Sequence, residues 1–258
     1  MKTLEESVAT AMDVKDKGIL PYLPYILQDF WEIGADPKTI ISLIRKHSSG
    51  SKGLKVLDLG CGKGSVSVKI AAECGFECHG IDAIPEFIEF SKGKAAEYNV
   101  AELCKFETGD IREAIKNLST YDVIILGAIG QVFGDYKTTF TLLVNNLKEN
   151  GIIIIDEGYV EEDSDFSHIQ VFSKKEILNQ IESSGMEMID MVLGHEDKQL
   201  FENYDTEYDQ LAQRCLELAE KHPDKAKIFL DYIKIQEEEY ENLKSGITTA
   251  TMVVKRKQ

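Results

Sequence analysis

The chain has 258 residues, 43% of them apolar, and its 45 acidic residues outnumber 29 lysines and arginines to give a formal net charge of −16. This length suits one α/β domain with an insertion, and the apolar fraction supports an ordinary packed core. Nucleic acids and anionic membranes are bound through basic residues, so a chain this acidic is a poor candidate for either. No apolar run approaches the ~18–20 residues that span a bilayer.

The first residues and the cysteines indicate a cytoplasmic protein. Residues 1–7 are charged and lead into no signal-peptide core. Five cysteines, an odd number, predict free thiols in a reducing compartment. Cys74 and Cys78 lie close together, but no second pair completes a zinc site, and we therefore expect no metal.

Residues 1–53 are predicted to form a helical extension before the first strand. Asp36 and Pro37 suit the N-cap and the first residue of a helix. Apolar residues then recur on one face of that helix: Ile40, Ile41, Leu43 and Ile44.

The most informative segment is 58–64, which reads Asp-Leu-Gly-Cys-Gly-Lys-Gly. It follows a short apolar strand at 56–57 and leads into a helix from Ser65, which is the strand–turn–helix start of a nucleotide-binding sheet. A carboxylate at the mouth of this turn, Asp58, would repel a pyrophosphate and would suit a ligand with an ammonium group. Gly64 stands one place early for the dinucleotide fingerprint, and no Gly-Lys-Ser/Thr follows for a phosphate-binding loop.

Two further acids follow predicted strands. Asp82 ends the next strand, about 20 residues after Gly60, where an acid commonly accepts hydrogen bonds from ribose hydroxyls. Asp110 follows a strand around 103–107, and a buried strand at 121–130 ends in small residues that would let a ligand approach the backbone. Each acid alone could equally be a helix cap or a turn residue. Their order after successive strands favours cofactor binding.

Strands and helices alternate from residue 54 to about residue 194, which predicts a parallel sheet covered on both faces. Ser173 and Glu176 form a capping box, and Gly185 suits the end of that helix. The β-branched segment 247–254 predicts a last strand. An earlier helix is predicted by apolar residues at helical spacing: Tyr136, Phe140, Leu143 and Leu147.

These motifs together resemble the class I S-adenosylmethionine-dependent methyltransferases, most closely the ubiquinone/menaquinone-biosynthesis-type small-molecule branch. The resemblance covers about residues 54–193 and includes the segments 127–129 and 147–157. One departure is 149–151, Glu-Asn-Gly, where the family usually has a Pro-Gly or similar turn; Asn-Gly serves the same turn chemistry. The resemblance implies an α/β fold, with a Rossmann-like, seven-stranded, mostly parallel sheet, an antiparallel last strand and helices on both faces.

The resemblance also implies which residues hold S-adenosylmethionine, which would leave as S-adenosylhomocysteine. Asp58 would hold the methionyl ammonium group, directly or through water. Asp82 would bind the ribose hydroxyls, and Asp110 the adenine amino group. The remaining contacts would come from Gly60, Cys61, Gly62 and Gly64 along the methionyl and ribose parts, Ala83, Ile84 and Ile111 against the adenine, and Gly127 and Ala128 at the methionine end.

Residues 195–245 stand where the usual methyltransferase has a short turn. Apolar residues recur at helical spacing on both sides of Pro223, which predicts two antiparallel amphipathic helices. This insertion could be a lid over the acceptor site, a dimer interface or a structural cover for the sheet edge. Residues 54–194 and 246–258 would then form the methyltransferase core, and residues 1–53 a helical extension that closes over the cofactor as a lid.

Methyl transfer requires an acceptor placed in line with the S–CH₃ bond, and a base only if the acceptor arrives protonated. The candidates for a base are Asp156, Glu157, His168 and His195, although each could equally be a capping, solvated or core residue. Aromatic faces can stabilise a sulfonium or a cationic acceptor. The aromatic candidates for the acceptor site are Tyr22, Tyr25, Phe30, Trp31, Tyr159, Tyr204 and Tyr208. The first four, in the N-terminal extension, could equally pack the N-terminal helix onto the sheet.

We therefore predict methyl transfer from S-adenosylmethionine to a small-molecule acceptor by in-line displacement. The alternative is a protein that binds S-adenosylmethionine as a sensor or scaffold without turnover, and a protein acceptor ranks below a small molecule. The expected partners are the small-molecule substrate and possible second copies of the chain in a homodimer, with no nucleic acid and no membrane. The identity of the acceptor does not follow from the fold.

Overall fold

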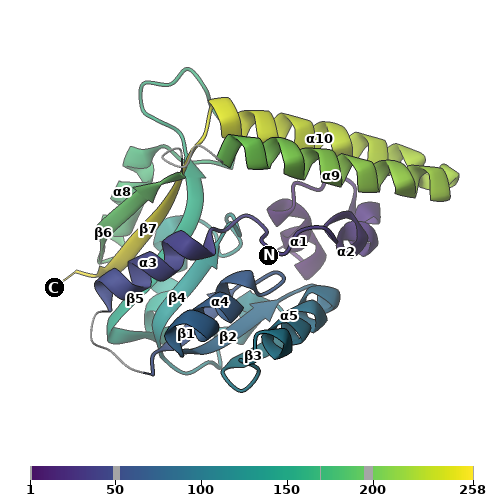
Figure 1. Ribbon diagram of the computed structural model, residues 1–258. Coiled ribbons are helices and arrows are strands. Elements are labelled where there is room, and N and C mark those ends of the chain that lie inside the picture. The colour runs from purple at the N-terminus through teal and green to yellow at the C-terminus, as the bar shows by residue number, and fades with distance from the viewer. Residues whose placement is uncertain (1, 49–52, 169, 195–199, 258) are drawn as a thin grey trace.

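The computed structural model describes residues 2–48, 53–168, 170–194 and 200–257. Seven strands form one sheet in the order β3-β2-β1-β4-β5-β7-β6 (Figure 1). Strands β1 to β5 are parallel, and β7 lies antiparallel between β5 and β6. The strands are β1 (Lys55–Leu59), β2 (Glu77–Asp82), β3 (Cys104–Thr108), β4 (Tyr121–Gly127), β5 (Leu147–Tyr159), β6 (Met186–Leu193) and β7 (Thr248–Arg256). The predicted fold class is confirmed.

Helices cover both faces of the sheet and bury its central strands. One apolar core joins the sheet to α3 (Pro37–His47), α4 (Ser65–Cys74) and α5 (Pro85–Glu97). The other joins it to α6 (Ile111–Ala114), α7 (Tyr136–Leu143) and α8 (Lys174–Ser183). Coverage on both sides explains why the central strands β1 and β4 are apolar along most of their length.

Several local signals in the sequence are confirmed. Asp36 caps α3 by accepting hydrogen bonds from the backbone N–H groups of Lys38 and Thr39. Ser173 and Glu176 form the reciprocal capping box at the start of α8. Gly185 has a φ of +78°, which lets the chain leave α8 through a left-handed residue.

Two details at the start of β5 differ from the prediction. The helical spacing that included Leu147 ends earlier: α7 stops at Leu143, a 3-10 turn follows, and Leu147 begins the strand. The segment 149–151 is part of β5, not a turn before it, and the pairing with β4 shifts register there. A Cβ on Gly151 would lie 2.9 Å from the carbonyl oxygen of Asp122, so glycine permits the close approach of the two strands.

A third apolar core lies outside the sheet and joins the two ends of the chain. It contains residues of α1 (Leu4–Ala11) and α2 (Leu23–Ile26), together with residues of α9 (Leu200–Lys221) and α10 (Ala226–Ser245). The helices α9 and α10 pack side by side as a long hairpin, and α1 and α2 lie beneath it (Figure 1). The predicted helices on both sides of Pro223 are therefore present, and their role as a lid, an interface or a cover stays a prediction.

None of the helices in the described ranges combines the length and the apolar character needed to cross a membrane.

Candidate functional site

The glycine turn after β1 is held in a conformation that favours glycine. Gly60, Gly62 and Gly64 all have positive φ, at +74°, +51° and +72°. A Cβ on Gly60 would lie 2.5 Å from Cγ2 of Ile129 in the loop after β4. The missing side chain therefore lets the two strand-end loops approach each other closely.

Hydrogen bonds fix this turn against the end of β2. The backbone N–H groups of Gly60 and Cys61 donate to the carbonyl of Ile81 at 2.8 and 3.1 Å. The carboxylate of Asp82 accepts from the N–H groups of Gly62 and Ile84, both at 2.9 Å. Burial raises the pKa of Asp82, and these backbone donors partly offset that effect.

The strand ends enclose a cavity of about 730 Å³, part of it open to solvent. Nine of the twelve residues predicted to bind the cofactor line it: Gly60, Gly62, Asp82, Ala83, Ile84, Asp110, Ile111, Gly127 and Ala128. The structure thus brings together four strand ends that are far apart in the sequence.

The other three predicted residues, Asp58, Cys61 and Gly64, do not line the cavity. Asp58 is buried, and its Oδ2 accepts a hydrogen bond of 2.7 Å from Ser67 Oγ in α4. Burial, together with the charge of Asp82, raises the pKa of Asp58 to about 6. Burial likewise raises the pKa of the Cys61 thiol, which argues against its acting as a nucleophile.

Asp110 has two structural roles besides lining the cavity. It caps α6 by accepting from the N–H of Arg112 at 2.9 Å. It also pairs with the guanidinium group of Arg112, which lowers the pKa of Asp110. Arg112 Nη1 also donates to the carbonyl of Lys2 at 2.9 Å. The arginine thereby connects the adenine end of the predicted site with the start of α1.

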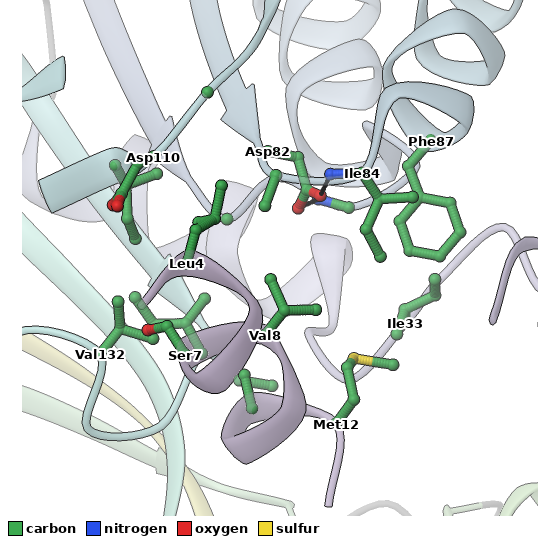
Figure 2. Close-up of a pocket in the computed structure, with 18 of the residues that line it drawn as sticks. Leu4, Ser7, Val8, Met12, Ile33, Asp82, Ile84, Phe87, Asp110 and Val132 are labelled. Carbon is green, nitrogen blue, oxygen red and sulfur yellow. Dashed lines mark hydrogen bonds between the residues drawn. The ribbon is translucent and has the colours of Figure 1, made fainter. Parts of the chain in front are cut away.

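Helix α1 covers the cavity, within the extension that is predicted as a lid, although none of its residues is among the predicted site residues. Figure 2 shows Leu4 and Val8 extending from α1 toward the side of the pocket that carries Asp82 and Ile84. A capping box between Thr3 and Glu6 starts this helix and was the signal that could have located it. The lining residues that were not predicted are Leu4, Ser7, Val8, Ala11, Met12, Ile33, Phe87, Gly109, Ile129 and Val132.

The methionine end of the predicted site is tightly built. Ala128 has a φ of +52°, an uncommon conformation for a residue with a side chain, and its N–H donates to the carbonyl of Asp156 at 2.8 Å. A Cβ on Gly34 would lie 2.5 Å from Cβ of Ala128, and one on Gly127 would lie 2.7 Å from Cβ of Ala35. The segment before α3 therefore presses closely on the end of β4.

The predicted aromatic residues of the N-terminal extension lie outside the cavity. Tyr22 packs edge-on against the ring of Phe229, with centroids 4.9 Å apart. The Trp31 Nε1–H donates to the carbonyl of Lys63 at 3.1 Å, and the Lys63 ammonium group in turn donates to the carbonyls of Phe30, at 2.6 Å, and Leu27. These contacts support packing of the extension against the glycine turn, whereas a role in acceptor binding stays a prediction.

The remaining aromatic candidates also have partners of their own. The hydroxyl of Tyr25 donates to Glu217 at 2.7 Å, and that of Tyr159 to Glu161 at 3.1 Å. The rings of Tyr204 and Tyr208 pack against Tyr240 between α9 and α10. Their role in acceptor binding likewise stays a prediction.

The candidates for a base differ in their surroundings. Asp156 accepts from the N–H of Asp36 at 3.0 Å, and burial raises its pKa to about 6. Glu157 accepts from the N–H of Gly130 at 2.6 Å, and burial, reinforced by nearby acids, raises its pKa to about 7. His168 Nε2 lies 3.5 Å from Glu239 of α10, and His195 lies outside the described residues.

Comparisons with known proteins show which family the chain belongs to. Residues 50–210 match the family described as "Methyltransferase domain". The ubiquinone biosynthesis O-methyltransferase of Rickettsia canadensis is 33% identical over 116 residues, which are 45% of this chain and 48% of that enzyme. The chain thus spans about half the length of the curated relatives it matches.

Solved structures share the fold at low sequence identity. A methyltransferase from Geobacter sulfurreducens, crystallised with S-adenosylhomocysteine, superposes with a TM-score of 0.74 at 22% identity and covers 92% of this chain and 98% of its own. The [4+2]-cyclase SpnF superposes with a TM-score of 0.70 at 14% identity, covering 99% of this chain and 97% of its own. The match over residues 50–210 places the chain, as its motifs indicated, in the methyltransferase-domain family.

Proposed function

We propose that this protein transfers a methyl group from S-adenosylmethionine to a small-molecule acceptor. The observation that carries the proposal is the cavity at the ends of β1, β2, β3 and β4, which combines backbone-lined walls with the carboxylates of Asp82 and Asp110. None of the described residues that line it is a lysine or an arginine. A pyrophosphate would lack counter-charges there, whereas an adenosyl sulfonium suits an acidic, partly apolar site.

The residues present fit an adenosyl ligand. Asp82 would accept hydrogen bonds from the ribose hydroxyls, because two backbone donors already hold its carboxylate at the mouth of the turn. Ile84 and Ile111 would flank the adenine, and Gly127 and Ala128 the methionine end. Asp58 lies behind the turn, so its contribution to an ammonium group would be through its charge or through water.

S-adenosylmethionine supplies, when bound, a methyl group already activated by a positively charged sulfur. The protein therefore has to position the acceptor, which can contribute ~7–11 kcal/mol to lowering the barrier, and to exclude water. Helix α1 is placed to exclude water, because its apolar side chains cover the cavity. A lid of this kind would have to open for exchange of the ligand.

The decisive experiment is a calorimetric titration of the full chain with S-adenosylmethionine, S-adenosylhomocysteine and NAD. We expect the first two to bind and NAD not to bind. Binding of NAD alone would refute the proposal. Transfer of labelled methyl groups to a panel of metabolites would then separate the enzyme from the alternative, a sensor or scaffold that binds S-adenosylmethionine without turnover.

We further infer that the acceptor is neither a nucleic acid nor part of a membrane surface, and that the protein acts in the cytoplasm. The net charge of −16 and the free cysteines support this inference. A protein acceptor and a homodimer stay open predictions, which a labelled proteome and light scattering would test.

A further inference from the structure

A second cavity lies next to the one proposed for the cofactor. It contains about 460 Å³ of space, part of it open to solvent, between the loop after β4, the start of α7 and the end of β5. Ile129 lines both cavities, so the loop after β4 is their common wall. Any group held in the second cavity would therefore lie beside the methionine end of the proposed cofactor site.

Aromatic rings form much of its wall. Tyr136, Phe133 and Phe172 all line the cavity. The rings of Tyr136 and Phe172 have centroids 5.9 Å apart and are tilted by 55°, so that they do not close over each other. Aromatic faces attract cations, by ~0.5–2 kcal/mol depending on desolvation.

One carboxylate, that of Glu157, lines the same cavity. The backbone N–H of Gly130 donates to its Oε1 at 2.6 Å and fixes the side chain to the shared loop. The Tyr136 hydroxyl makes no hydrogen bond within the described part of the chain, and burial, reinforced by the Glu157 charge, raises the pKa of this hydroxyl. The cavity thus offers an anion and a free hydroxyl, both anchored on rigid elements.

The charge of Glu157 is not balanced by a basic side chain of the described residues. The charged side chains that act on it most are Asp156 and Asp13, and both are acidic. Asp13, at the end of α1, in turn faces Glu239 and His168. An ionised carboxylate that is taken out of water and faces like charges is costly unless a cation compensates it.

We propose that this cavity is the acceptor subsite and that it receives a small amine, held by the Glu157 carboxylate, the Tyr136 hydroxyl and the surrounding aromatic rings. This inference rests on the proposed function. It assigns the substrate class, which neither the fold nor the glycine turn determines. A neutral alcohol would leave the carboxylate charge uncompensated, and an anionic acceptor would be repelled by Glu157 and its acidic neighbours.

The reaction balances with Glu157 as the proton acceptor. The amine binds as its ammonium ion, and the Glu157 carboxylate takes one of its protons, which frees the lone pair of the nitrogen. That lone pair forms the new N–C bond to the methyl carbon, while the electron pair of the S–C bond remains on sulfur. The positive charge thus passes from sulfur to the methylated ammonium product, and the Glu157 carboxylic acid returns its proton to solvent.

Binding of three small molecules of similar size tests the charge preference: ethylamine, ethanol and acetate. Each is titrated at pH 8 into the complex with S-adenosylhomocysteine and followed by ligand-observed NMR. At this pH ethylamine is cationic and Glu157 is mostly ionised, because its pKa is about 7. We expect ethylamine to bind and the other two to bind at least about tenfold more weakly, as befits a charge-assisted hydrogen bond.

Variants separate the subsite from unspecific charge effects. Glu157→Gln should weaken ethylamine binding by about tenfold or more, and Tyr136→Phe by roughly twofold to fivefold. Glu149→Gln is the matched control, because Glu149 is an exposed residue of the same strand and the charge change is the same. It should leave ethylamine binding unchanged.

The same samples are titrated with S-adenosylhomocysteine alone. Loss of ethylamine binding in Glu157→Gln with intact S-adenosylhomocysteine affinity supports the subsite. Equal binding of ethylamine, ethanol and acetate, or equal effects of Glu157→Gln and Glu149→Gln, would overturn it. Failure of S-adenosylhomocysteine to bind the unmodified protein would instead refute the proposed function itself.

Discussion

The two sides of the proposed site are built in different ways. On one side, the turn after β1 forms a wall of backbone at Gly60 and Gly62, and hydrogen bonds hold this turn against the end of β2. On the other side, α1, the loop after β4 and the end of β5 each contribute individual side chains. The first side is determined by local sequence, and the second only by tertiary packing.

This difference explains where prediction from sequence succeeded. A turn whose backbone needs left-handed conformations favours glycine, and this preference leaves a pattern in the sequence. Gly60, with a φ of +74° and Ile129 pressed against it, is such a position. By contrast, the apolar residues Leu4 and Val8 of α1 look in sequence like those of any amphipathic helix.

The backbone-built side should be the more sensitive to a single added side chain. Gly60→Val would force a branched residue into a left-handed conformation and against Ile129, so we expect no measurable S-adenosylhomocysteine binding in calorimetry. Gly60→Ala, the milder variant, should bind S-adenosylhomocysteine at least about tenfold more weakly, because overpacking typically costs ~1–3 kcal/mol.

Gly75→Ala is the control for these variants. Gly75 caps α4 with a φ of +68°, and a Cβ there would meet no atom within 4 Å. It should lose ~1–2 kcal/mol of unfolding free energy from the same backbone strain and keep its affinity. Equal loss of binding in Gly75→Ala and Gly60→Ala would show that strain, not closure of the site, is responsible.

The next largest effect is expected at Asp82. Its carboxylate lines the cavity and accepts from two backbone N–H groups, and a charged hydrogen bond contributes ~1.5–3 kcal/mol. Asp82→Ala should therefore weaken S-adenosylhomocysteine binding by about tenfold to a hundredfold, measured by calorimetry. Asp82→Asn keeps one acceptor oxygen and should lose less affinity for S-adenosylhomocysteine than Asp82→Ala. Unchanged affinity in Asp82→Ala would remove this residue from the site.

The aromatic residues show why the acceptor side was harder to predict. Tyr22 and Trp31 were candidates because aromatic rings can hold cations, yet one packs on Phe229 and the other binds the backbone of Lys63. The rings that do line the second cavity, including Tyr136 and Phe172, come from a helix start and a loop far apart in sequence. Composition reveals that such rings exist, but only packing decides which of them meet.

Side chains of the lid should have a smaller effect than the backbone-built wall. Replacing Leu4 and Val8 together by alanine removes part of the apolar cover of the cavity without changing the glycine turn. We expect S-adenosylhomocysteine to bind roughly threefold to tenfold more weakly, mainly through faster dissociation in stopped-flow measurements. Leu142→Ala, at an exposed leucine of α7, is the control and should dissociate at the unmodified rate. Unchanged dissociation in the double variant would show that α1 does not retain the ligand.

The smallest expected effect is a pH dependence of stability that comes from Glu157, on the side of the site that individual side chains form. The pKa of Glu157 is raised from 4.5 to about 7 in the folded protein, so between these values the folded state holds more protons than the unfolded state. Stability without ligand should therefore fall as pH rises from 6 to 8. The contribution of this one group is about 1 kcal/mol over that range, or roughly 2–4 °C in Tm for a chain of this size.

Calorimetric unfolding of the unmodified protein, Glu157→Gln and Glu149→Gln at pH 6 and pH 8 isolates this contribution. Asp13, Asp58 and Asp156 have pKa values raised to about 6 and should retain a smaller fall in every variant. Glu157→Gln should reduce the fall in Tm, whereas Glu149→Gln should not, because Glu149 is exposed. An identical fall in all three would mean that the Glu157 carboxyl is as well solvated in the folded chain as in the unfolded one. A ligand cation would then have no buried charge to compensate, and the amine subsite would lose its physical basis.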